Sequence, residues 1–575
     1  MKILLTTLHA KYVHSSLALP YLAAACGVME GIETVIREFT VNERHELLLK
    51  KIAAEKADIT AFSCYIWNIE QTLKLASDLK KILPNTCVIL GGPEVSCNPE
   101  EILQNHGAVD CVISGEGEEP FSKLVSAWKQ YGNFTDAVKS AGQGIAFRDG
   151  TSVIVNPPAG PVRDLDSIPS PFSAGLVDMG KPLVYYETSR GCPFSCAFCM
   201  SSLGSGVNSF SMERIRQDLL YIMDHGAATV KLVDRTFNYD ADRANTIWEF
   251  ILRHNRTSRF HFEIASDLLT EKNLEILGKV PKGMFRFEIG VQSGEVATLE
   301  KVARKSNLDR LFRNVGKLLS GTGVIVHLDL VAGLPGEDYN GFLASLQRLL
   351  DAMPLFIQVE PLKVLKGSPM ESIAAREGYA FSSHPPYKIL HTPDLPFHDI
   401  SRVETVSGLL DVFFNSGRFH TLLRAVAELE PLSGFFHCLA IHAEKEDNTA
   451  GMSLRGSFEM LWEFIRGYYS EKAAESLSGA LSYDFCLCEY PVSGNLPDFF
   501  RSGEIIRPKI TTGEIIKSLG IDRGSKVRCF ALRFPQDYTC DPWRKDTTDI
   551  LFVYISAPGK GLQVKPISLA GKTAS

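Results

Sequence analysis

Long apolar runs are missing from this sequence, and so are several other features that would define a class of protein. No stretch reaches the roughly eighteen uninterrupted apolar residues of a membrane-spanning helix. The first residues, MKILLTTLHAKY, hold too short an apolar segment for a secretory signal and no small-residue cleavage site. The net charge of -7 gives no overall basic excess of the kind that binds nucleic acid. We expect a cytoplasmic protein with no membrane association and no nucleic-acid partner.

A disulfide framework is missing too. The thirteen cysteines are an odd number, and most stand singly in apolar runs, as Cys64 does in ITAFSCYIW and Cys111 in VDCVISGE. Single cysteines in such runs are typical of reduced, buried thiols. One group differs: Cys192, Cys196 and Cys199 lie close together in RGCPFSCAFC. This group is the candidate reactive site.

The chain of 575 residues is too long for one hydrophobic core. At roughly 150 residues per domain it predicts three or four domains. The only repetition is two successive series of alternating strands and helices. Changes of pattern predict a doubly wound domain over residues 1–135, a hairpin and linker over 136–180, a partial barrel over 181–372 and a C-terminal domain over 373–575.

The first domain alternates five strand-like runs with amphipathic segments. The runs are KILLTT, ETVIREF, DITAFSCY, CVILGG and DCVISGE. This alternation predicts a parallel sheet with helices on both faces, and five strands fit the flavodoxin-like order better than the six-stranded dinucleotide order. No G-x-G-x-x-G follows the first run, which disfavours NAD and FAD.

Two glycine-rich turns follow the fourth and fifth runs. They are GGPEVS at residues 91–96 and SGEGEEP at 114–120. Ligands of open α/β sheets bind beyond the carboxyl ends of the strands, where glycine lets the backbone approach them closely. A single turn of this kind would be explained by glycines that only allow the chain to reverse direction, without a ligand. Two of them at neighbouring strand ends favour a bound ligand.

The rest of the chain changes pattern twice. A D-G turn between alternating runs near residues 145–155 predicts a β-hairpin before a proline-rich linker. Six strand-like runs from KPLVYYETS to LFIQVEPLKVLKG then predict a partial (β/α)6 barrel, with its functional residues at the carboxyl ends of the strands. Beyond about residue 375, helical periodicity in VETVSGLLDVFF and SFEMLWEFIRGYY, with strands at SKVRCFALRF and TDILFVYIS, predicts a mostly helical α+β domain.

The C-x3-C-x2-C spacing does not fit the common metal sites. Structural zinc takes four ligands, usually from two spaced pairs, and ferredoxins supply four thiolates per cluster. Cys486 and Cys488 in DFCLCEYP are too close together for a zinc pair, and we expect them to pack in a strand. Three thiolates on one loop can hold three irons of a [4Fe–4S] cube. The open fourth iron implies chemistry rather than support.

The segment SRGCPFSCAFC resembles the radical S-adenosylmethionine (SAM) signature C-x3-C-x-aromatic-C, with Phe198 before the last cysteine. Its place after the first strand of the second series is similar to that in the superfamily. The resemblance implies that the open iron binds the amino and carboxylate groups of the SAM methionine. It also implies that the reduced cluster cleaves SAM to a 5′-deoxyadenosyl radical, with Phe198 near the adenine.

Other strand ends are similar to the SAM-binding positions of the superfamily. VKLVDRTF carries Asp234 at the end of the second barrel strand, where related enzymes hold the SAM amino group. Taken singly, any such residue has a helix cap or a solvated loop charge as its alternative interpretation. The resemblance implies further SAM contacts from Glu263, Glu288, Gln292, Ser293, Arg304, Asp329, Gly333 and Pro335.

A five-stranded domain ahead of such a barrel resembles the cobalamin-binding radical SAM enzymes, over roughly residues 1–370. The loop after the first strand, LHAKYVHSSLALPYL, departs from the D-x-H-x-x-G of other cobalamin proteins. His14 is a cobalt ligand or, as the missing Asp favours, a residue that packs against the first helix. The C-terminal region resembles an accessory domain of unassigned function. The cobalamin contacts that the resemblance implies are Ser63, Gly91, Gly92, Gly115 and Glu116.

The resemblance implies an anaerobic radical SAM enzyme with a [4Fe–4S] cluster, SAM and cobalamin. The leading hypothesis is a methyltransferase acting on an unactivated carbon of a small-molecule or peptide substrate, with an external reductant of the flavodoxin or ferredoxin type. Rearrangement, cyclisation or oxidation with the same cofactors is the alternative. Dispersed N-terminal cysteines and an acidic chain disfavour a tRNA methylthiotransferase. The intact cysteine loop disfavours a non-catalytic cobalamin sensor.

Overall fold

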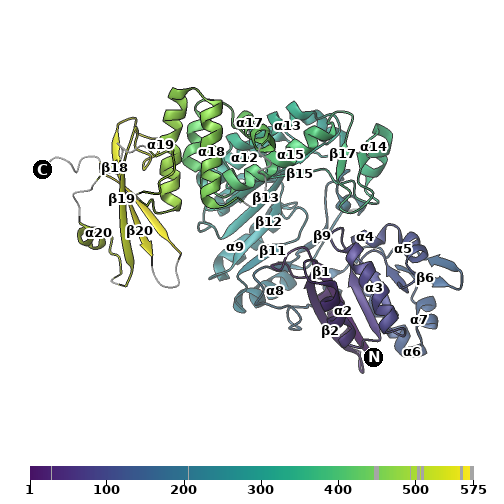
Figure 1. Ribbon diagram of the computed structural model, residues 1–575. Coiled ribbons are helices and arrows are strands. Elements are labelled where there is room, and N and C mark those ends of the chain that lie inside the picture. Colours follow the sequence, from purple (N-terminus) through teal and green to yellow (C-terminus); the bar gives the residue numbers. More distant parts are fainter. Residues whose placement is uncertain are drawn as a thin grey trace. The chain divides into compact units, whose positions relative to one another are not determined.

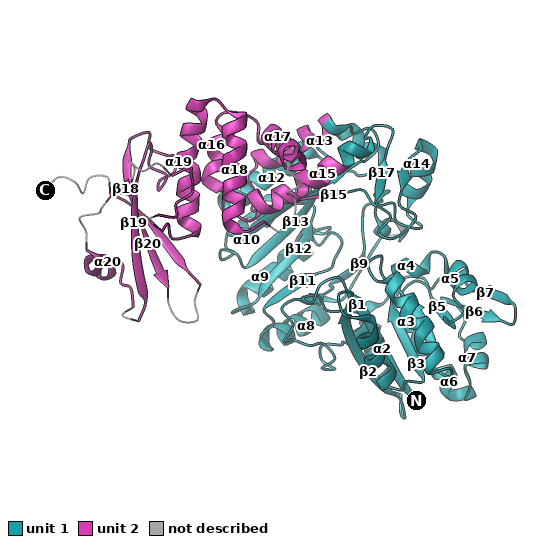
Figure 2. Ribbon diagram, in the orientation of Figure 1, with its two compact units in different colours: residues 1–339, 361–400 teal, residues 340–360, 401–575 magenta. Residues whose placement is uncertain are grey.

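The computed structural model describes residues 1–575 except 28, 205, 446–451, 493, 501–504, 507–510, 523, 557–560 and 570–575. The chain forms two compact units, coloured separately in Figure 2: residues 1–339 with 361–400, and residues 340–360 with 401–575. Within the described ranges, no helix combines the length and the apolar character needed to cross a membrane.

Unit 1 begins with the predicted parallel sheet, whose strands run in the order β2-β1-β3-β4-β5. This is the flavodoxin-like order expected from the sequence. All five strands form where the apolar runs predict them. They are β1 (Lys2–His9), β2 (Glu33–Thr40), β3 (Ile59–Ser63), β4 (Cys87–Gly91) and β5 (Cys111–Ile113).

Two apolar layers cover this sheet because alternate side chains of each strand point to opposite faces. Helices α2 (His45–Ala54), α3 (Ile69–Ile82) and α5 (Pro99–Asn105) pack on one face. Helices α1 (Ala18–Cys26), α6 (Glu118–Tyr131) and α7 (Phe134–Ser140) pack on the other. The short helix α4 (Pro93–Ser96) follows β4, and Figure 1 shows it beside α5. The single cysteines Cys26, Cys64, Cys87 and Cys111 are buried in these layers, as predicted.

The predicted hairpin forms, but it belongs to the first sheet. Strands β6 (Ile145–Asp149) and β7 (Ser152–Val155) are joined by a turn at Gly150 (φ +62°). They pair antiparallel and extend the sheet beyond β5, with Cys111 opposite Phe147. The sequence shows the turn, but the partner of β6 is not visible in its local pattern. The proposed boundary at residue 135 therefore falls inside a continuous seven-stranded sheet.

The second series forms the predicted parallel strands. Within unit 1, β8 (Val184–Tyr186), β11 (Thr229–Leu232), β12 (Arg259–Ile264), β13 (Phe285–Gln292) and β14 (Ile325–Ala332) are neighbours in this order. The sixth strand of the series in the chain is β15 (Phe356–Pro361). The intervening helices include α8 (Met212–Asp224), α9 (Ala241–His254), α10 (Glu271–Leu277), α11 (Val296–Lys301) and α12 (Leu308–Gly321).

Alternation along these strands separates an aromatic layer from a polar one. Phe262 and Phe287 are fully buried and contact Trp248 of α9. The intervening residues Glu263 and Glu288, opposite each other in register, are only partly buried. The apolar face of the strands therefore packs under the helices, and the other face carries polar side chains. Unit 1 ends with α14 (Pro369–Glu377) and the strand pair β16 (Ala380–Phe381) and β17 (Ile389–His391).

Unit 2 has the predicted mostly helical α+β composition. Its helices include α16 (His420–Ala427), α17 (Leu432–Lys445), α18 (Leu454–Tyr468), α19 (Glu471–Cys488) and α20 (Thr512–Ser518). Helix α13 (Tyr339–Asp351) and helix α15 (Phe397–Leu409), which continues as the π-helical segment Leu410–Asn415, each begin in unit 1. An antiparallel sheet has the order β18-β19-β20-β21: Ile505–Ile506, Lys526–Phe534, Thr548–Ser556 and Gln563–Ser568.

The strand expected at DFCLCEYP is wrong. Cys486 and Cys488 lie in the last turn of helix α19. Good helix formers precede them, and Ser470 caps the helix by accepting a hydrogen bond from the Ala473 backbone N–H. Cys486 is buried and Cys488 is partly buried, so packing remains the interpretation of this pair.

Candidate functional site

The three cysteines come after β8, on a loop closed by a small antiparallel pair. Strand β9 (Ser189–Gly191) pairs with β10 (Val207–Ser209). Gly191 has a φ of +90°, and a Cβ there would lie 2.2 Å from the Gly206 carbonyl oxygen. Only glycine fits this close approach. Residues 192–204 are thereby held as a loop at the carboxyl end of the first barrel strand.

Asp234 fixes the start of this loop. Its carboxylate accepts hydrogen bonds from the Thr188 backbone N–H at 3.0 Å and from the hydroxyls of Thr188 and Ser189 at 2.5 Å each. Arg243 of α9 donates to the Thr188 carbonyl oxygen at 2.8 Å. Asp234 is buried and its acceptor sites face the chain itself. The structure therefore places Asp234 behind the cysteine loop, away from the cavity that the loop borders.

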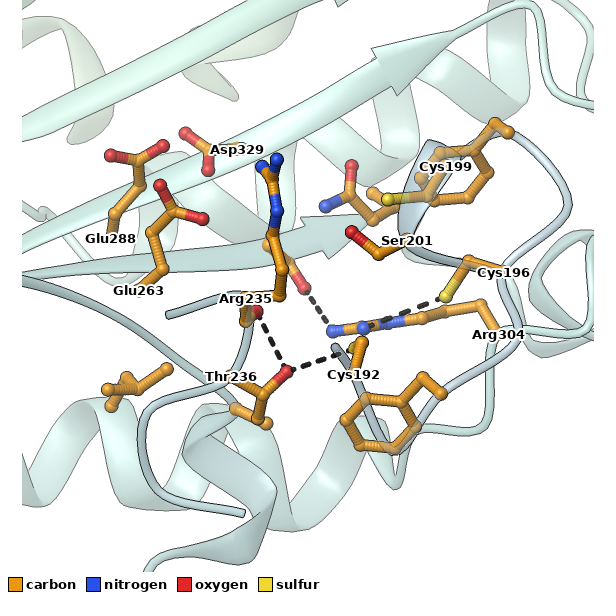
Figure 3. Close-up of a pocket in the computed structure, with 16 residues that line it drawn as sticks. Cys192, Cys196, Cys199, Ser201, Arg235, Thr236, Glu263, Glu288, Arg304 and Asp329 are labelled. Carbon is orange, nitrogen blue, oxygen red and sulfur yellow. Dashed lines mark hydrogen bonds between the residues drawn. The ribbon is translucent and has the colours of Figure 1, made fainter. Parts of the chain in front are cut away.

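The cysteines border one cavity of about 200 Å³, which we call the cysteine cavity (Figure 3). The loop is fastened at its middle, where the Ala197 N–H donates to the Val302 carbonyl oxygen at 2.9 Å and the Met370 N–H donates to the Ala197 carbonyl oxygen at 3.0 Å. Six of the ten residues predicted to contact SAM line this cavity together with the cysteines. They are Phe198, Glu263, Glu288, Gln292, Arg304 and Asp329.

The other four predicted residues do not line it. Ser293 is buried and donates to Glu337 at 2.6 Å. Gly333 (φ +89°) lies against Ile389, whose Cδ1 would be 2.1 Å from an added Cβ. Asp234 holds the loop, and Pro335 lies outside the cavity lining. Arg235, Thr236, Ser201 and Phe194 line the cavity and were missed. The sequence does carry a signal for Arg235 and Thr236, because they come directly after Asp234, which was predicted as a site residue at the end of this strand.

The three thiols border one cavity, as the thiolates of a [4Fe–4S] cube border their cluster. Among the described residues, no three His, Cys, Asp or Glu side chains converge so that they could share one metal ion. A [4Fe–4S] cube takes one thiolate per iron, so its ligands surround it instead of meeting at a point. Three cysteines around one cavity match that requirement.

Arg304 supplies a positive charge beside the thiols. Its guanidinium donates to the Gly290 carbonyl oxygen at 3.0 Å and lies 3.9 Å from the Cys196 sulfur. The ring of Phe194, between the first two cysteines, lies 5.0 Å from the guanidinium carbon. Burial raises the pKa of the Cys196 thiol, and the guanidinium acts against this by stabilising the thiolate. A positive charge at this distance would stabilise an iron–sulfur cluster, which carries negative charge when thiolates ligate it.

A charged network lines the barrel side of the cavity. The Lys231 ammonium lies 3.2 Å from Glu263 and 3.0 Å from Glu288, and His261 lies 2.9 Å from Glu288. Burial opposes ionisation of Glu288, but the hydrogen bond from His261 and the Lys231 charge lower its pKa to about 2. Burial dominates at Glu263 and raises its pKa. Lys231 was not predicted as a site residue.

Gln292 has a backbone conformation that is unusual for its side chain. Its φ is +71°, and its amide nitrogen would lie 2.1 Å from a Cβ on Gly290. A non-glycine residue in the left-handed region costs free energy and is often found at functional sites. The side chain folds back over Gly290 and lines the cysteine cavity.

A second cavity, also of about 200 Å³, lies at the carboxyl ends of the first sheet. We call it the strand-end cavity. It is lined by four of the six residues predicted to contact cobalamin: Ser63, Gly91, Gly92 and Gly115. A Cβ on Gly92 would lie 2.5 Å from the Cys64 carbonyl oxygen, and one on Gly115 would lie 2.4 Å from that of Ala159. These glycines are needed for the chain's own close contacts, so a tight turn explains them without a ligand.

The remaining two, His14 and Glu116, line a larger cavity of about 650 Å³ between the first sheet and the barrel, the middle cavity. His14 Nδ1 lies 2.7 Å from the Tyr185 hydroxyl of β8, and the two rings stack. Burial lowers the pKa of His14, with His9 and Lys11 adding to the effect. The structure thus places His14 against a barrel strand.

Glu116 belongs to an ion-pair hub centred on Arg190. The Arg190 guanidinium donates to Glu116 at 3.0 Å, to Glu118 at 2.6 Å and to Glu187 at 2.8 Å. Burial raises the pKa of Glu187 to about 7, and this effect outweighs the opposing effect of the Arg190 charge. Two of these acids come from the first sheet's glycine-rich turn, and Arg190 precedes Cys192 by two residues. The hub joins the two halves of unit 1 beside the cysteine loop.

Three family models match separate parts of the chain. Residues 3–125 match the B12 binding domain, residues 186–349 match the radical SAM superfamily, and residues 377–522 match a protein family of unknown function, DUF4080. The second match includes all three cysteines, and the first includes the two glycine-rich turns.

Individual relatives are similar over part of their length. The cobalamin-dependent radical SAM methyltransferase TokK of Streptomyces tokunonensis is 26% identical over 374 residues, covering 61% of this chain and 53% of TokK. The hopanoid C-3 methylase of Methylococcus capsulatus is 28% identical over 300 residues, covering 50% of this chain and 56% of the methylase. The chain spans about half the length of the curated relatives that it matches.

Two solved structures share the fold. The cobalamin-dependent SAM radical enzyme OxsB has a TM-score of 0.59 at 14% identity, covering 84% of this chain and 83% of OxsB. The radical SAM methyltransferase TsrM of Kitasatospora setae has a TM-score of 0.54 at 16% identity, covering 66% of this chain and 77% of TsrM. The matched models show that the chain carries an N-terminal B12-binding domain, a radical SAM domain and a C-terminal DUF4080 region, in this order.

Proposed function

We propose that this protein is a cobalamin-dependent radical SAM methyltransferase acting on an unactivated carbon. The carrying observation is that the cysteine cavity and the middle cavity have two lining residues in common, Arg235 and Glu263. The middle and strand-end cavities in turn have Ala18, Tyr65, Gly117 and Glu118 in common. The three cavities are therefore neighbours in a row from the carboxyl ends of the first sheet to the three thiols.

Each part of this space fits one cofactor by the residues around it. The three cysteines would hold the [4Fe–4S] cluster, with Arg304 beside Cys196. Phe198, Glu263, Glu288, Gln292 and Asp329 would contact SAM, and the strand-end and middle cavities would take cobalamin. When bound, the cluster with SAM supplies a carbon-centred radical and cobalamin supplies the methyl group. The chain contributes positioning and a space shielded from water.

The predicted residues outside the cavities have a supporting part in this proposal. Asp234 and Ser293 would hold the cysteine loop and the turn after β13 in place. Positioning groups of this kind orient the ligating residues of metal sites. Gly333 and Pro335 would shape the loop after β14. His14, held by Tyr185, would pack beside the cobalamin instead of binding its metal.

The substrate class, a small molecule or peptide, and an external reductant of the flavodoxin or ferredoxin type belong to the proposal. The relatives support methyl transfer by their names, but anaerobic magnesium-protoporphyrin IX monomethyl ester cyclases are also similar, with one from Cereibacter sphaeroides 31% identical over 166 residues. Cyclisation with the same cofactors is therefore the alternative that the test must separate.

The test is anaerobic turnover of the reconstituted full-length chain. Iron, sulfide and cobalamin are measured first. SAM with a deuterated methyl group is then supplied with a reductant and an anaerobic extract of small molecules. Methyl transfer predicts both 5′-deoxyadenosine and S-adenosylhomocysteine, together with a product that carries the labelled methyl group. 5′-Deoxyadenosine without S-adenosylhomocysteine would favour rearrangement, and neither product with an intact cluster would refute a radical SAM enzyme.

A further inference from the structure

Arg235 stands apart from the other cations of unit 1. It lies three residues after the end of β11, and Figure 3 shows its side chain extending into the cysteine cavity, with the thiols to one side and Glu263, Glu288 and Asp329 to the other. Within the part of the chain that the structure describes, its guanidinium makes no hydrogen bond and no ion pair. Its side chain is exposed to the cavity.

The neighbouring cations are all engaged. Lys231 is held between Glu263 and Glu288, and Arg304 donates to the Gly290 carbonyl oxygen. Arg190 is surrounded by three carboxylates, and Arg243 donates to Thr188. Each of these cations donates to a carboxylate or a backbone carbonyl oxygen of the chain itself. Arg235 therefore differs from the other four cations in that none of its guanidinium N–H groups is engaged by the described residues, so the whole guanidinium is available to a ligand.

Its position indicates which ligand. Arg235 and Glu263 are the two residues that line both the cysteine cavity and the middle cavity. In the proposed function, the radical arises on one side of this junction and the methyl group is held on the other. The carbon that receives the methyl group must therefore lie between them, within reach of Arg235.

We propose that Arg235 binds an oxyanion of the substrate, a carboxylate or a phosphate, at the junction of the two cavities. This rests on the proposed function and narrows its substrate to an anionic molecule. A guanidinium presents its N–H groups as a planar fork that pairs with both oxygens of such a group.

The SAM carboxylate is the competing source of an oxyanion, and the experiment separates the two. The holoprotein, with cluster, cobalamin and SAM bound, is titrated with succinate and with inorganic phosphate, and heat is recorded. SAM affinity is measured separately from the change that SAM causes in the electron paramagnetic resonance spectrum of the reduced cluster. The variants are R235Q, R235K and the control R253Q, which removes an exposed arginine of α9 outside the cavities.

We expect R235Q to weaken binding of at least one probe anion by about ten- to a hundredfold, the effect of losing a charge-assisted hydrogen-bonded pair. R235K should lose less than R235Q because it keeps the charge without the fork. R253Q should bind as the unaltered protein does. SAM affinity should stay within about twofold in all variants, since twofold is well below the loss of one such contact.

Two results would overturn the inference. A matching loss of SAM affinity in R235Q would assign Arg235 to the SAM carboxylate. Equal anion affinity in R235Q and the unaltered protein, or no anion binding by either, would show that Arg235 holds no oxyanion. The failure of the proposed function looks different: no 5′-deoxyadenosine forms on reduction of the unaltered holoprotein, whatever the anion titrations give.

Discussion

The Arg190 guanidinium, two residues before Cys192, donates to the Glu118 carboxylate of the first domain at 2.6 Å. Two further carboxylates, Glu116 and Glu187, contact the same guanidinium. The start of the cysteine loop is therefore tied to the glycine-rich turn after β5. The tie joins the two regions that the family models assign to B12 binding and to radical SAM chemistry.

Replacing Arg190 with Gln should destabilise unit 1. Three carboxylates would be left partly buried without their cation, and breaking a buried ion pair in this way costs about 3–5 kcal/mol. The free energy of unfolding from denaturant titration measures the loss. R253Q, at an exposed position of α9, is the matched control and should change it by no more than about 0.5 kcal/mol. An R190Q variant as stable as this control would contradict the assignment of the hub.

Replacing any one of Cys192, Cys196 or Cys199 with Ala should abolish iron–sulfur incorporation. A cube held by two thiolates on one loop loses a ligand that the chain does not replace. Iron and sulfide content and the visible absorbance after anaerobic reconstitution measure this. The C97A variant is the control. Cys97 is partly buried, its thiol donates a hydrogen bond to the Lys366 carbonyl oxygen, and it does not line the cysteine cavity. Equal iron content in C196A and C97A would refute the cluster assignment.

Arg304 should raise the reduction potential of the cluster. A cation and hydrogen bonds near the sulfurs favour the reduced state, which carries one more negative charge. Removing it in R304Q should lower the potential by about 60 mV, the equivalent of ~1.4 kcal/mol for one electron. Potentiometric titration followed by electron paramagnetic resonance gives the value. An unchanged potential in a variant with full iron content would mean that the guanidinium acts only on Gly290.

Gly92 should be intolerant of a side chain. A Cβ there would lie 2.5 Å from the Cys64 carbonyl oxygen, and its φ of +106° is strained for any other residue. G92A should lose about 1–3 kcal/mol of stability. Its cobalamin affinity should fall with it, because the strand-end cavity would deform. G107A is a fitting control, since an added Cβ at Gly107 meets nothing within 4 Å. Thermal unfolding and equilibrium dialysis with cobalamin test both effects.

Asp484 should make the stability of unit 2 depend on pH. Burial raises its pKa to about 7, although the Thr421 and Leu422 N–H groups favour the charged form. The folded state therefore keeps a proton that the unfolded state has already released between about pH 4 and 7. Stability should fall as pH rises through this window, by up to about 1.4 kcal/mol per pH unit. The D484N variant should lose this slope, and denaturant titrations at several pH values provide the comparison.

The strand series of unit 1 could be predicted because each strand is short, apolar and followed by a polar or glycine residue. The cysteine loop could be predicted because its spacing carries its chemistry. The contacts between residues far apart in the sequence could not be predicted. The hub at Arg190 joins residues more than seventy positions apart, and the pairing of β6 with β5 is equally non-local. Asp234 lies at the predicted strand end, yet its three acceptor contacts turn it away from the cavity.

The error at Cys486 and Cys488 has a local cause. The stretch DFCLCEY is rich in residues that favour strands, but it completes a helix that begins more than ten residues earlier, at Glu471. Tertiary packing overrides propensity at its end: the helix is buried along most of its length. Arg235 illustrates a different limit. It is of interest because its guanidinium has no hydrogen bond or ion pair with the described residues, and a sequence pattern does not show this.

The chain leaves unit 1 after residue 339, contributes residues 340–360 to unit 2, and returns to unit 1 until residue 400. During synthesis, the radical SAM half of unit 1 is therefore incomplete until residue 400 has left the ribosome, and residues 340–360 await partners that are made later still. Neither unit is encoded by one uninterrupted stretch of the gene. A truncation at residue 372 would divide both units, so fragments of this protein are best designed around the interleaving and not around the family boundaries.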